Sequence, residues 1–267
     1  MSPRKINIFE NGMPESLQIK KHLMKTFSEL GIEVPEKYEQ DSTLIVCIGG
    51  DGSLLQTLKE CDFPETPIVG VNTGHLGFFQ ELQPEEIENL VYYFKNDEFE
   101  VQKLYPVTAR VETKEGIEKV KSLNEIVIKG AHSHAANLDI FIGESFIEQF
   151  IGDGILVATP AGSTAYNYAL GGSIVDPRLE LLQVTPIAPI NSSAYRSFTS
   201  SVLLPPHLSL KVIPKYTKSR EICIAADGME SCFPDITAVH VGFSKKPIKL
   251  LRFPDYDFWK KVKQKLL

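Results

Sequence analysis

The sequence lacks several features that would place it in a major functional class. None of its apolar runs reaches the roughly 20 residues needed to cross a bilayer. Residues 1–5 lead into a strand-like run without the apolar core of a signal peptide. Acidic side chains outnumber basic ones by 34 to 28, for a formal net charge of −6. We therefore expect a cytoplasmic protein that binds neither membranes nor nucleic acids.

Cysteine is scarce, and its placement gives no sign of a metal site or a redox pair. The chain has four cysteines in 267 residues, and no two of them have Cys-x-x-Cys spacing. Each lies in or near an apolar stretch, so we expect reduced thiols without a functional role. A chain of this length can bury a core without disulfides or structural metal. The four residues are Cys47, Cys61, Cys223 and Cys232.

The first hundred residues alternate between strand-like and helix-like patterns. Residues 43–48 form a continuous apolar run, as expected of a strand buried on both faces of a parallel sheet. Residues 84–94 carry apolar side chains at the spacing of one helical face. The alternation predicts an α/β domain with an open, mostly parallel sheet. The expected strands are 5–9, 43–48 and 67–71, and the expected helices are 14–30, 53–60 and 84–94.

The pattern changes near residue 100, where short runs with period-two alternation begin. Gly, Pro, Asn and Asp separate these runs, which is typical of an antiparallel domain, here an all-β sandwich-like one. A helical turn is expected at 163–170. The expected strands are 107–111, 125–128, 138–142, 208–213, 222–226 and 237–243.

Residues 257–267 have the pattern of a C-terminal helix, which we expect to pack back on the first domain. Its lysines indicate a solvated helix face, with an anionic partner as the alternative. The chain is therefore divided into an α/β domain, 1–100 together with 254–267, and a β-rich domain, 101–253. The lysines are Lys260, Lys261, Lys263 and Lys265.

A Gly-Gly-Asp-Gly turn joins the buried strand 43–48 to the next helix. Glycines let the backbone approach a ligand closely, and the free amides at a helix start favour phosphate groups. We therefore predict phosphate binding at Gly49, Gly50 and Gly52. Asp51 would repel phosphates, which fits a carboxylate that binds a metal or accepts a proton from a hydroxyl nucleophile. A tight turn with Asp51 as the helix N-cap is the alternative.

Residues 72–78, Asn-Thr-Gly-His-Leu-Gly-Phe, follow the third strand. Loops after neighbouring parallel strands meet at the carboxyl edge of a sheet, so this loop should lie beside Asp51. His75 would either contact a phosphate or have a purely structural role. Asn124 and Glu125 precede a later strand, and their amide and carboxylate match a ribose diol or an adenine edge. A strand-entry turn is the alternative for this pair.

Two glycine-rich bends flank one strand in the second half of the chain. Gly152-Asp153-Gly154 forms the first bend, and Thr-Pro-Ala-Gly-Ser-Thr-Ala-Tyr at 159–166 forms the second, closed by Gly171-Gly172. Small residues in the second bend would bring backbone amides against a ligand, and Tyr166 could stack on a heterocycle. The pair of bends predicts a ligand-binding unit.

Two other features have simpler interpretations. His132 and His134 have no third metal ligand nearby in the sequence, so they indicate a surface loop. Asp227-Gly228 is typical of a hairpin turn.

Together these motifs resemble the NAD kinase family. The Gly-Gly-Asp-Gly turn alone also marks diacylglycerol and sphingosine kinases and recurs in phosphofructokinases, whereas the 159–166 block is far more selective. The order and spacing of the matches cover nearly the whole chain, and its compact length is similar to the short, Gram-positive bacterial form. The matching elements are 49–52, 72–78, 124–125, 152–154, 159–166, 171–172, 185–189 and 227–228.

The resemblance implies phosphoryl transfer from ATP, or also from polyphosphate, to the 2′-hydroxyl of the adenosine ribose of NAD. It also implies Mg²⁺ dependence and a homotetramer in which a neighbouring subunit partly completes the NAD site. By the same analogy Asp51 accepts the proton. The residues that the analogy assigns to NAD binding are Gly52, Phe78, Asn124, Glu125, Asp153, Thr164, Ala165, Tyr166, Asn167, Tyr168, Ala169 and Ala188.

Two other functions compete with this interpretation. A lipid kinase of the diacylglycerol type would need an apolar acyl pocket, and the polar, glycine-rich stretch 152–172 argues against one. A non-catalytic dinucleotide sensor could keep the 159–166 block, but nothing would then require Asp51. Ile151 and Met229 depart from the family pattern, which often has a basic or polar residue at the first position and Gln at the second, so neither is included among the assigned site residues.

Overall fold

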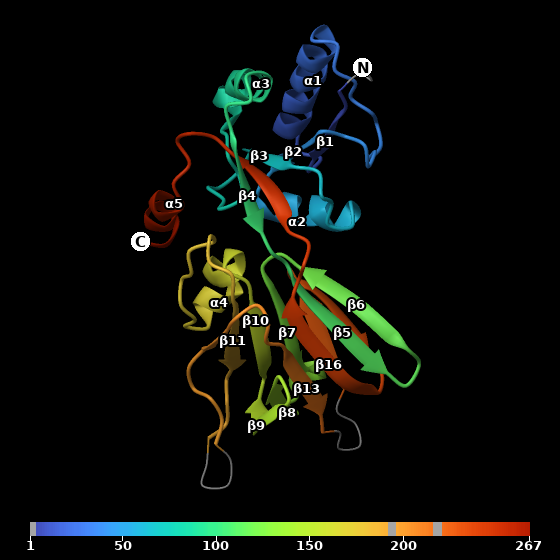
Figure 1. Ribbon diagram of the computed structural model, residues 1–267, viewed down its shortest axis with the longest axis vertical. Coiled ribbons are helices and arrows are strands. Elements are labelled where there is room, and N and C mark those ends of the chain that lie inside the picture. The colour runs from blue at the N-terminus through green and yellow to red at the C-terminus, as the bar shows by residue number, and fades with distance from the viewer. Residues whose placement is uncertain (1–3, 192–195, 216–220) are drawn as a thin grey trace. The chain divides into compact units, whose positions relative to one another are not determined.

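The computed structural model describes residues 4–191, 196–215 and 221–267. The chain divides into two compact units (Figure 1). The first unit comprises Met1–Leu104 and Pro247–Leu267, and the second comprises Tyr105–Lys246. Among the described residues, no helix is both long enough and apolar enough to cross a membrane.

The first unit contains a five-stranded sheet with three helices connecting its strands. Neighbouring strands are parallel except at one edge, where β17 and β4 are antiparallel. Every residue of β2 is buried, as the apolar run predicted. The order across the sheet is β1 (Ile6–Glu10), β2 (Leu44–Gly49), β3 (Ile68–Asn72), β17 (Ile248–Arg252) and β4 (Glu100–Leu104), and the helices are α1 (Pro14–Glu29), α2 (Asp51–Glu60) and α3 (Ile87–Lys95).

The second unit is a sandwich of two antiparallel sheets, each with six strands. Inward side chains of both sheets, including Val111, Ile126 and Phe150, form one apolar core. The first sheet has the order β12 (Val202–Leu204), β11 (Leu182–Ile187), β10 (Gly154–Ala158), β7 (Glu125–Gly130), β14 (Ile222–Ala226) and β15 (Met229–Phe233). The second has the order β6 (Ile117–Ser122), β5 (Val107–Thr113), β16 (Ile236–Phe243), β13 (Leu210–Pro214), β8 (Ala136–Ile142) and β9 (Ser145–Gly152).

The C-terminal helix α5 (Phe258–Leu266) packs on the first unit, as predicted. The Asp257 carboxylate accepts hydrogen bonds from the amides of Trp259 and Lys260, which caps the helix start. Phe258 is buried, and its ring centroid lies 5.9 Å from that of Phe78. The chain enters the first unit before this helix, because β17 already belongs to its sheet. The two units therefore divide at Leu104 and Pro247, a few residues from the predicted boundaries.

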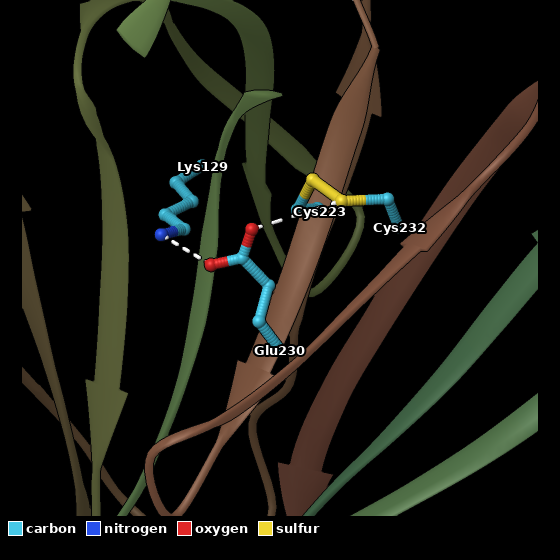
Figure 2. Close-up of a disulfide and its surroundings, with 4 residues drawn as sticks. All are labelled: Lys129, Cys223, Glu230 and Cys232. Atoms are coloured by element: carbon cyan, nitrogen blue, oxygen red, sulfur yellow. Dashed lines mark hydrogen bonds and ion pairs between the residues drawn. A yellow bond between two sulfur atoms is a disulfide. The ribbon is translucent and has the colours of Figure 1, made fainter. Parts of the chain in front are cut away.

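The expectation of four reduced thiols is wrong for one pair. Cys223 on β14 and Cys232 on β15 form a disulfide across the hairpin, beside the Lys129–Glu230 ion pair (Figure 2). The reason is register: the fourth residue before Asp227 lies opposite the fourth residue after Gly228, so a two-residue turn aligns the two cysteines.

The other two cysteines are free, as expected. Both Cys47 and Cys61 are buried. Burial raises the pKa of Cys47 to about 12 and that of Cys61 to about 11, so both thiols stay protonated and unreactive near neutral pH.

Candidate active site

The Gly-Gly-Asp-Gly turn lies at the carboxyl end of β2, where the chain enters α2. Gly50 is the N-cap residue, and Asp51 is the first residue inside the helix, so Asp51 does not cap it. Its carboxylate instead accepts hydrogen bonds from the amides of Phe78 and Phe79, at 2.9 and 3.0 Å. Each carboxylate oxygen holds one amide, which fixes the orientation of the group.

The 72–78 loop lies beside Asp51, as the sheet topology predicted. The approach is so close that a Cβ on Gly77 would lie 2.3 Å from Asp51 Oδ1, and only glycine avoids this clash. Phe78 is buried against the C-terminal helix. His75 is exposed.

Cationic side chains from the C-terminal segment surround this loop, and sequence reasoning missed their role. Arg252 forms an ion pair with Glu81 at 2.8 Å, with both side chains almost fully buried, and it also donates to the carbonyls of Phe78 and Phe79. Lys265 lies 3.4 Å from Asp51 Oδ2. The lysine-rich helix carried a signal, since an anionic partner was its alternative interpretation, but nothing local points to Asp51.

Lys261 anchors the same helix. Its ammonium group donates to the carbonyl of Gln80 and lies 5.2 Å from the ring centroid of Tyr256. Burial and, to a smaller extent, the Arg252 charge together lower the pKa of Lys261 to about 8, against the opposing effects of Glu81 and Asp51.

The second unit contains a pocket of about 520 Å³ that gathers three predicted site residues. Glu125 comes from the start of β7, Asp153 from the bend before β10, and Tyr166 from the start of the short helix α4 (Tyr166–Ala169). Eight further residues line it, and alternation along β7 could have indicated two of them, because every second residue faces the same way. They are Val127, Lys129, Gly130, His134, Ile187, Ala225, Gly228 and Glu230.

The Asn124–Glu125 corner carries unsatisfied polar atoms. Both side chains are buried, and among the described residues Asn124 Oδ1 and Glu125 Oε2 have no hydrogen-bond partner. Burial, together with the neighbouring Asp227 carboxylate, raises the pKa of Glu125 to about 8. Buried polar atoms without partners are costly, so this corner is suited to receive hydroxyl or amino groups of a ligand.

Asp227 does more than form the predicted hairpin turn. Its carboxylate accepts hydrogen bonds from Ser122 Oγ at 2.5 Å and from the amides of Leu123 and Asn124, each at 2.8 Å. Desolvation raises the pKa of Asp227, and these hydrogen bonds oppose the rise. The carboxylate therefore fixes the backbone that presents Asn124 and Glu125.

The 159–166 block packs against the same corner. The Thr159 hydroxyl donates to the Leu123 carbonyl at 2.6 Å. A Cβ on Gly162 would lie 2.1 Å from the Asn124 carbonyl oxygen, so the close approach requires glycine. The structure thus brings the Asn124–Glu125 motif and this block together, although the sequence separates them by more than thirty residues.

Other predicted NAD-binding residues of the second unit are placed differently. Asn167 is fully buried, and its Oδ1 accepts a hydrogen bond from Thr185 Oγ1 at 2.7 Å. Its side chain therefore supports the short helix α4 from inside the fold. In the described chain, the pocket lining does not include the remaining ones. These are Thr164, Ala165, Tyr168, Ala169 and Ala188, of which Thr164 and Ala165 are half-buried and the other three are exposed.

The histidine pair is divided by the fold. His134 lines the pocket, where the sequence indicated only a surface loop. His132 adopts a positive φ of 50° in the turn before β8 and is not part of the pocket lining described here.

Comparisons with known proteins agree with these motifs. Residues 6–99 match the family described as ATP-NAD kinase N-terminal domain, and residues 123–253 match the ATP-NAD kinase C-terminal domain. The chain is 33% identical to NAD kinase of Finegoldia magna over 98% of this chain and 97% of the relative. It is 34% identical to NAD kinase of Streptococcus agalactiae over 97% of this chain and 94% of the relative.

Two solved structures share the fold. Yeast NADH kinase complexed with NADH superposes with a TM-score of 0.85 at 20% identity, covering 98% of this chain and 87% of that one. An NAD kinase from Archaeoglobus fulgidus in complex with ATP gives a TM-score of 0.75 at 21% identity, covering 97% and 98%. With two family domains spanning most of its length and full-length relatives above 30% identity, this chain belongs to the NAD kinase family.

Proposed function

We propose that the protein transfers the γ-phosphoryl group of ATP to the 2′-hydroxyl of the adenosine ribose of NAD, giving NADP and ADP, with Asp51 as the proton acceptor. The observation that carries this assignment is the Asp51 carboxylate, held by two backbone amides at a glycine-rich helix start. A new bond forms between the ribose oxygen and phosphorus while the bond to the β-phosphate oxygen breaks. The proton of the hydroxyl passes to Asp51.

The pocket of the second unit supports a dinucleotide acceptor. Glu125 and Asp153 offer oxygens for ribose hydroxyls, and Asn124 Oδ1 is a buried acceptor for an amino or hydroxyl group. Tyr166 is 46% exposed and lines the pocket, so its ring can contact a flat base. We assign Thr164 to Ala169 and Ala188 to the surrounding wall, with Asn167 acting through its buried hydrogen bond to Thr185.

The phosphate side of the reaction falls to the first unit. A Cβ on Gly50 or Gly52 would meet nothing within 4 Å, so the backbone of the turn is open there, whereas a Cβ on Gly49 would clash with Ser53. We assign all three glycines to phosphate binding, because the start of α2 offers free amides to an anion. We assign Phe78 to the adenosine pocket, because its amide already orients Asp51. ATP is the proposed donor, and polyphosphate is an alternative that has the same phosphate chemistry.

Mg²⁺ fits this site as an ion carried by the donor. Magnesium usually binds one or two protein carboxylates together with substrate phosphates. Among the described residues, one group of three His, Cys, Asp or Glu side chains has its ligand atoms within 4.8 Å of one another. It consists of Cys223, Glu230 and Cys232, and the two cysteines form the disulfide. When bound, the ion neutralises charge on the transferring group.

We further propose a cytoplasmic homotetramer with the NAD site near a subunit interface. Edge strands of both sheets of the second unit expose apolar side chains, Phe146 on β9 and Leu203 on β12, each more than half exposed. Unpaired strand edges of this kind are commonly covered by another chain. Light scattering tests the assembly, and a fully active monomer at micromolar concentration would contradict it.

One assay separates the proposed activity from its two rivals. Purified protein is incubated with ATP, Mg²⁺ and either NAD or dispersed diacylglycerol, and the phosphorylated product is identified by mass. We expect NADP from NAD and no phosphorylated lipid. Phosphatidic acid as the product would indicate a lipid kinase, and calorimetric NAD binding without any NADP would indicate a sensor.

A further inference from the structure

The phosphate-facing turn contains an electrostatic conflict. Asp51 stands in the first turn of α2, where the donor phosphates are expected. The amides of Phe78 and Phe79 orient its carboxylate but do not remove its negative charge. Two anionic groups in one site repel each other unless a cation lies nearby. The Mg²⁺ that accompanies the donor acts on the phosphates, so a positive charge next to Asp51 would lower the remaining repulsion from the carboxylate.

The last turn of the C-terminal helix supplies that charge. Lys265 Nζ lies 3.4 Å from Asp51 Oδ2 and 4.9 Å from the ring centroid of Phe78, although 214 residues separate the lysine from the aspartate. The side chains of Asp51 and Lys265 are 23% and 36% exposed, so the pair is partly shielded and still open to a ligand. We propose that Lys265 is a positioning residue that offsets the charge of Asp51 and thereby lets an anionic phosphoryl donor approach.

The helix is anchored so that Lys265 reaches this position. Phe258 and Val262 are buried along one face of α5. Lys261, one turn before Lys265, donates to the Gln80 carbonyl. Residues four apart on a helix lie on the same side, so fixing Lys261 against the loop directs Lys265 toward Asp51. The inference rests on the proposed role of the Asp51 turn in phosphoryl transfer.

The other two nearby cations have different partners. Arg252 is paired with Glu81 in a buried ion pair. The ammonium group of Lys261 donates to the Gln80 carbonyl. Among the described residues, Lys265 is therefore the cation that contacts the Asp51 carboxylate.

The test uses Lys265→Met, which keeps an apolar stem against Phe78 and removes the charge. Lys263→Met is the matched control, because it removes the same charge from an exposed position on the same helix. We expect Lys265→Met to raise the KM for ATP about fivefold, because the free energy of a partly exposed ion pair at the upper end of its range corresponds to that factor. The KM for NAD should stay within about twofold of the parent value. Lys265→Arg should restore the KM for ATP. Equal values for Lys265→Met and Lys263→Met, or a lower melting temperature without rescue by arginine, would overturn the proposal.

A binding cycle in the absence of NAD tests whether Lys265 acts through Asp51. ATP affinity is measured for the parent, Lys265→Met, Asp51→Asn and the double variant. If Lys265 offsets the charge of Asp51, its loss weakens ATP binding in the parent and has little effect in the Asp51→Asn background. Equal losses in both backgrounds would mean that Lys265 binds phosphate directly, contrary to the proposal. The cycle needs no turnover, so failure of the parent protein to make NADP would overturn the proposed function and leave this comparison valid.

Discussion

The carboxylate of Asp227 accepts a hydrogen bond from the backbone amide of Asn124, 103 residues earlier in the chain, at 2.8 Å. The same carboxylate holds the Leu123 amide and the Ser122 hydroxyl, so one side chain fixes three consecutive residues before Glu125. The hairpin turn of the β14–β15 pair thereby sets the geometry of a pocket corner that lies on a different strand.

Asp227→Asn should therefore loosen that corner. The asparagine NH₂ group would face amides that need an acceptor, which costs about 1–3 kcal/mol for each unsatisfied buried donor. We expect a lower melting temperature together with weaker NAD binding, measured by calorimetry. Asp235→Asn, at an exposed aspartate that also has a positive φ, is the control. Unchanged NAD affinity in a destabilised Asp227→Asn protein would limit Asp227 to a structural role.

Asp51→Asn should still fold and bind NAD but lack the proton acceptor. Its melting temperature should be lower, because the asparagine NH₂ group would face the amide of Phe78 or Phe79. We expect turnover to fall by roughly 10²-fold or more, within the range of a positioned general base. The measurement is steady-state NADP formation with a thermal melt of the same sample. Asp255→Asn, at an exposed aspartate, should retain parent turnover. Turnover of the Asp51 variant within a few-fold of the parent would remove Asp51 from the chemistry.

Tyr166→Ala should weaken NAD binding much more than ATP binding. A ring that stacks on a base contributes about 1–3 kcal/mol, or roughly 5- to 150-fold in affinity. Calorimetric titration with each nucleotide checks this, and Tyr92→Ala, which removes another exposed ring, is the control. If Tyr166→Ala lowered the melting temperature and left NAD affinity unchanged, the tyrosine would be a packing residue.

Local sequence patterns predicted much of the fold, because the spacing of apolar residues reflects which faces of a strand or helix are buried. The apolar run of β2 and the period-two strands of the second unit both follow from which faces meet the core. The loop beside Asp51 was also predictable, since parallel strands place their following loops at one edge.

Contacts between distant segments were not predictable in the same way. Arg252 and Lys265 reach the Asp51 loop because β17 and α5 return to the first unit, and no local pattern records that return. The disulfide is an intermediate case: the Asp227–Gly228 turn fixed the register that aligns Cys223 with Cys232, but cysteine spacing alone gave no indication.

That disulfide should respond to reductant. It closes a loop with a sequence separation of 9, for which chain entropy predicts a stabilisation of about 2.5 kcal/mol. We expect reduction to lower the melting temperature of the parent protein, and Cys232→Ser to melt at the same lower temperature with or without reductant. Mass analysis of the free thiols confirms the redox state in each sample. An unchanged melting temperature of the parent protein after reduction of the disulfide would contradict the prediction.

The raised pKa of Glu125 should contribute to the pH dependence of the free energy of unfolding. Its pKa rises from the usual 4.5 to about 8 in the fold, because burial and Asp227 disfavour the ionised form. Between these values the unfolded chain has released the proton that the folded chain still holds, so the free energy of unfolding falls as pH rises from about 4.5 to about 8 and levels off above. Glu125→Gln removes this contribution, since a neutral amide does not titrate. We expect melting temperatures measured from pH 5 to pH 9 to fall less steeply for Glu125→Gln than for the parent. Glu118→Gln, at an exposed glutamate on β6, should retain the parent slope. Parallel curves for parent and Glu125→Gln would mean that Glu125 is ionised in the folded protein across this range.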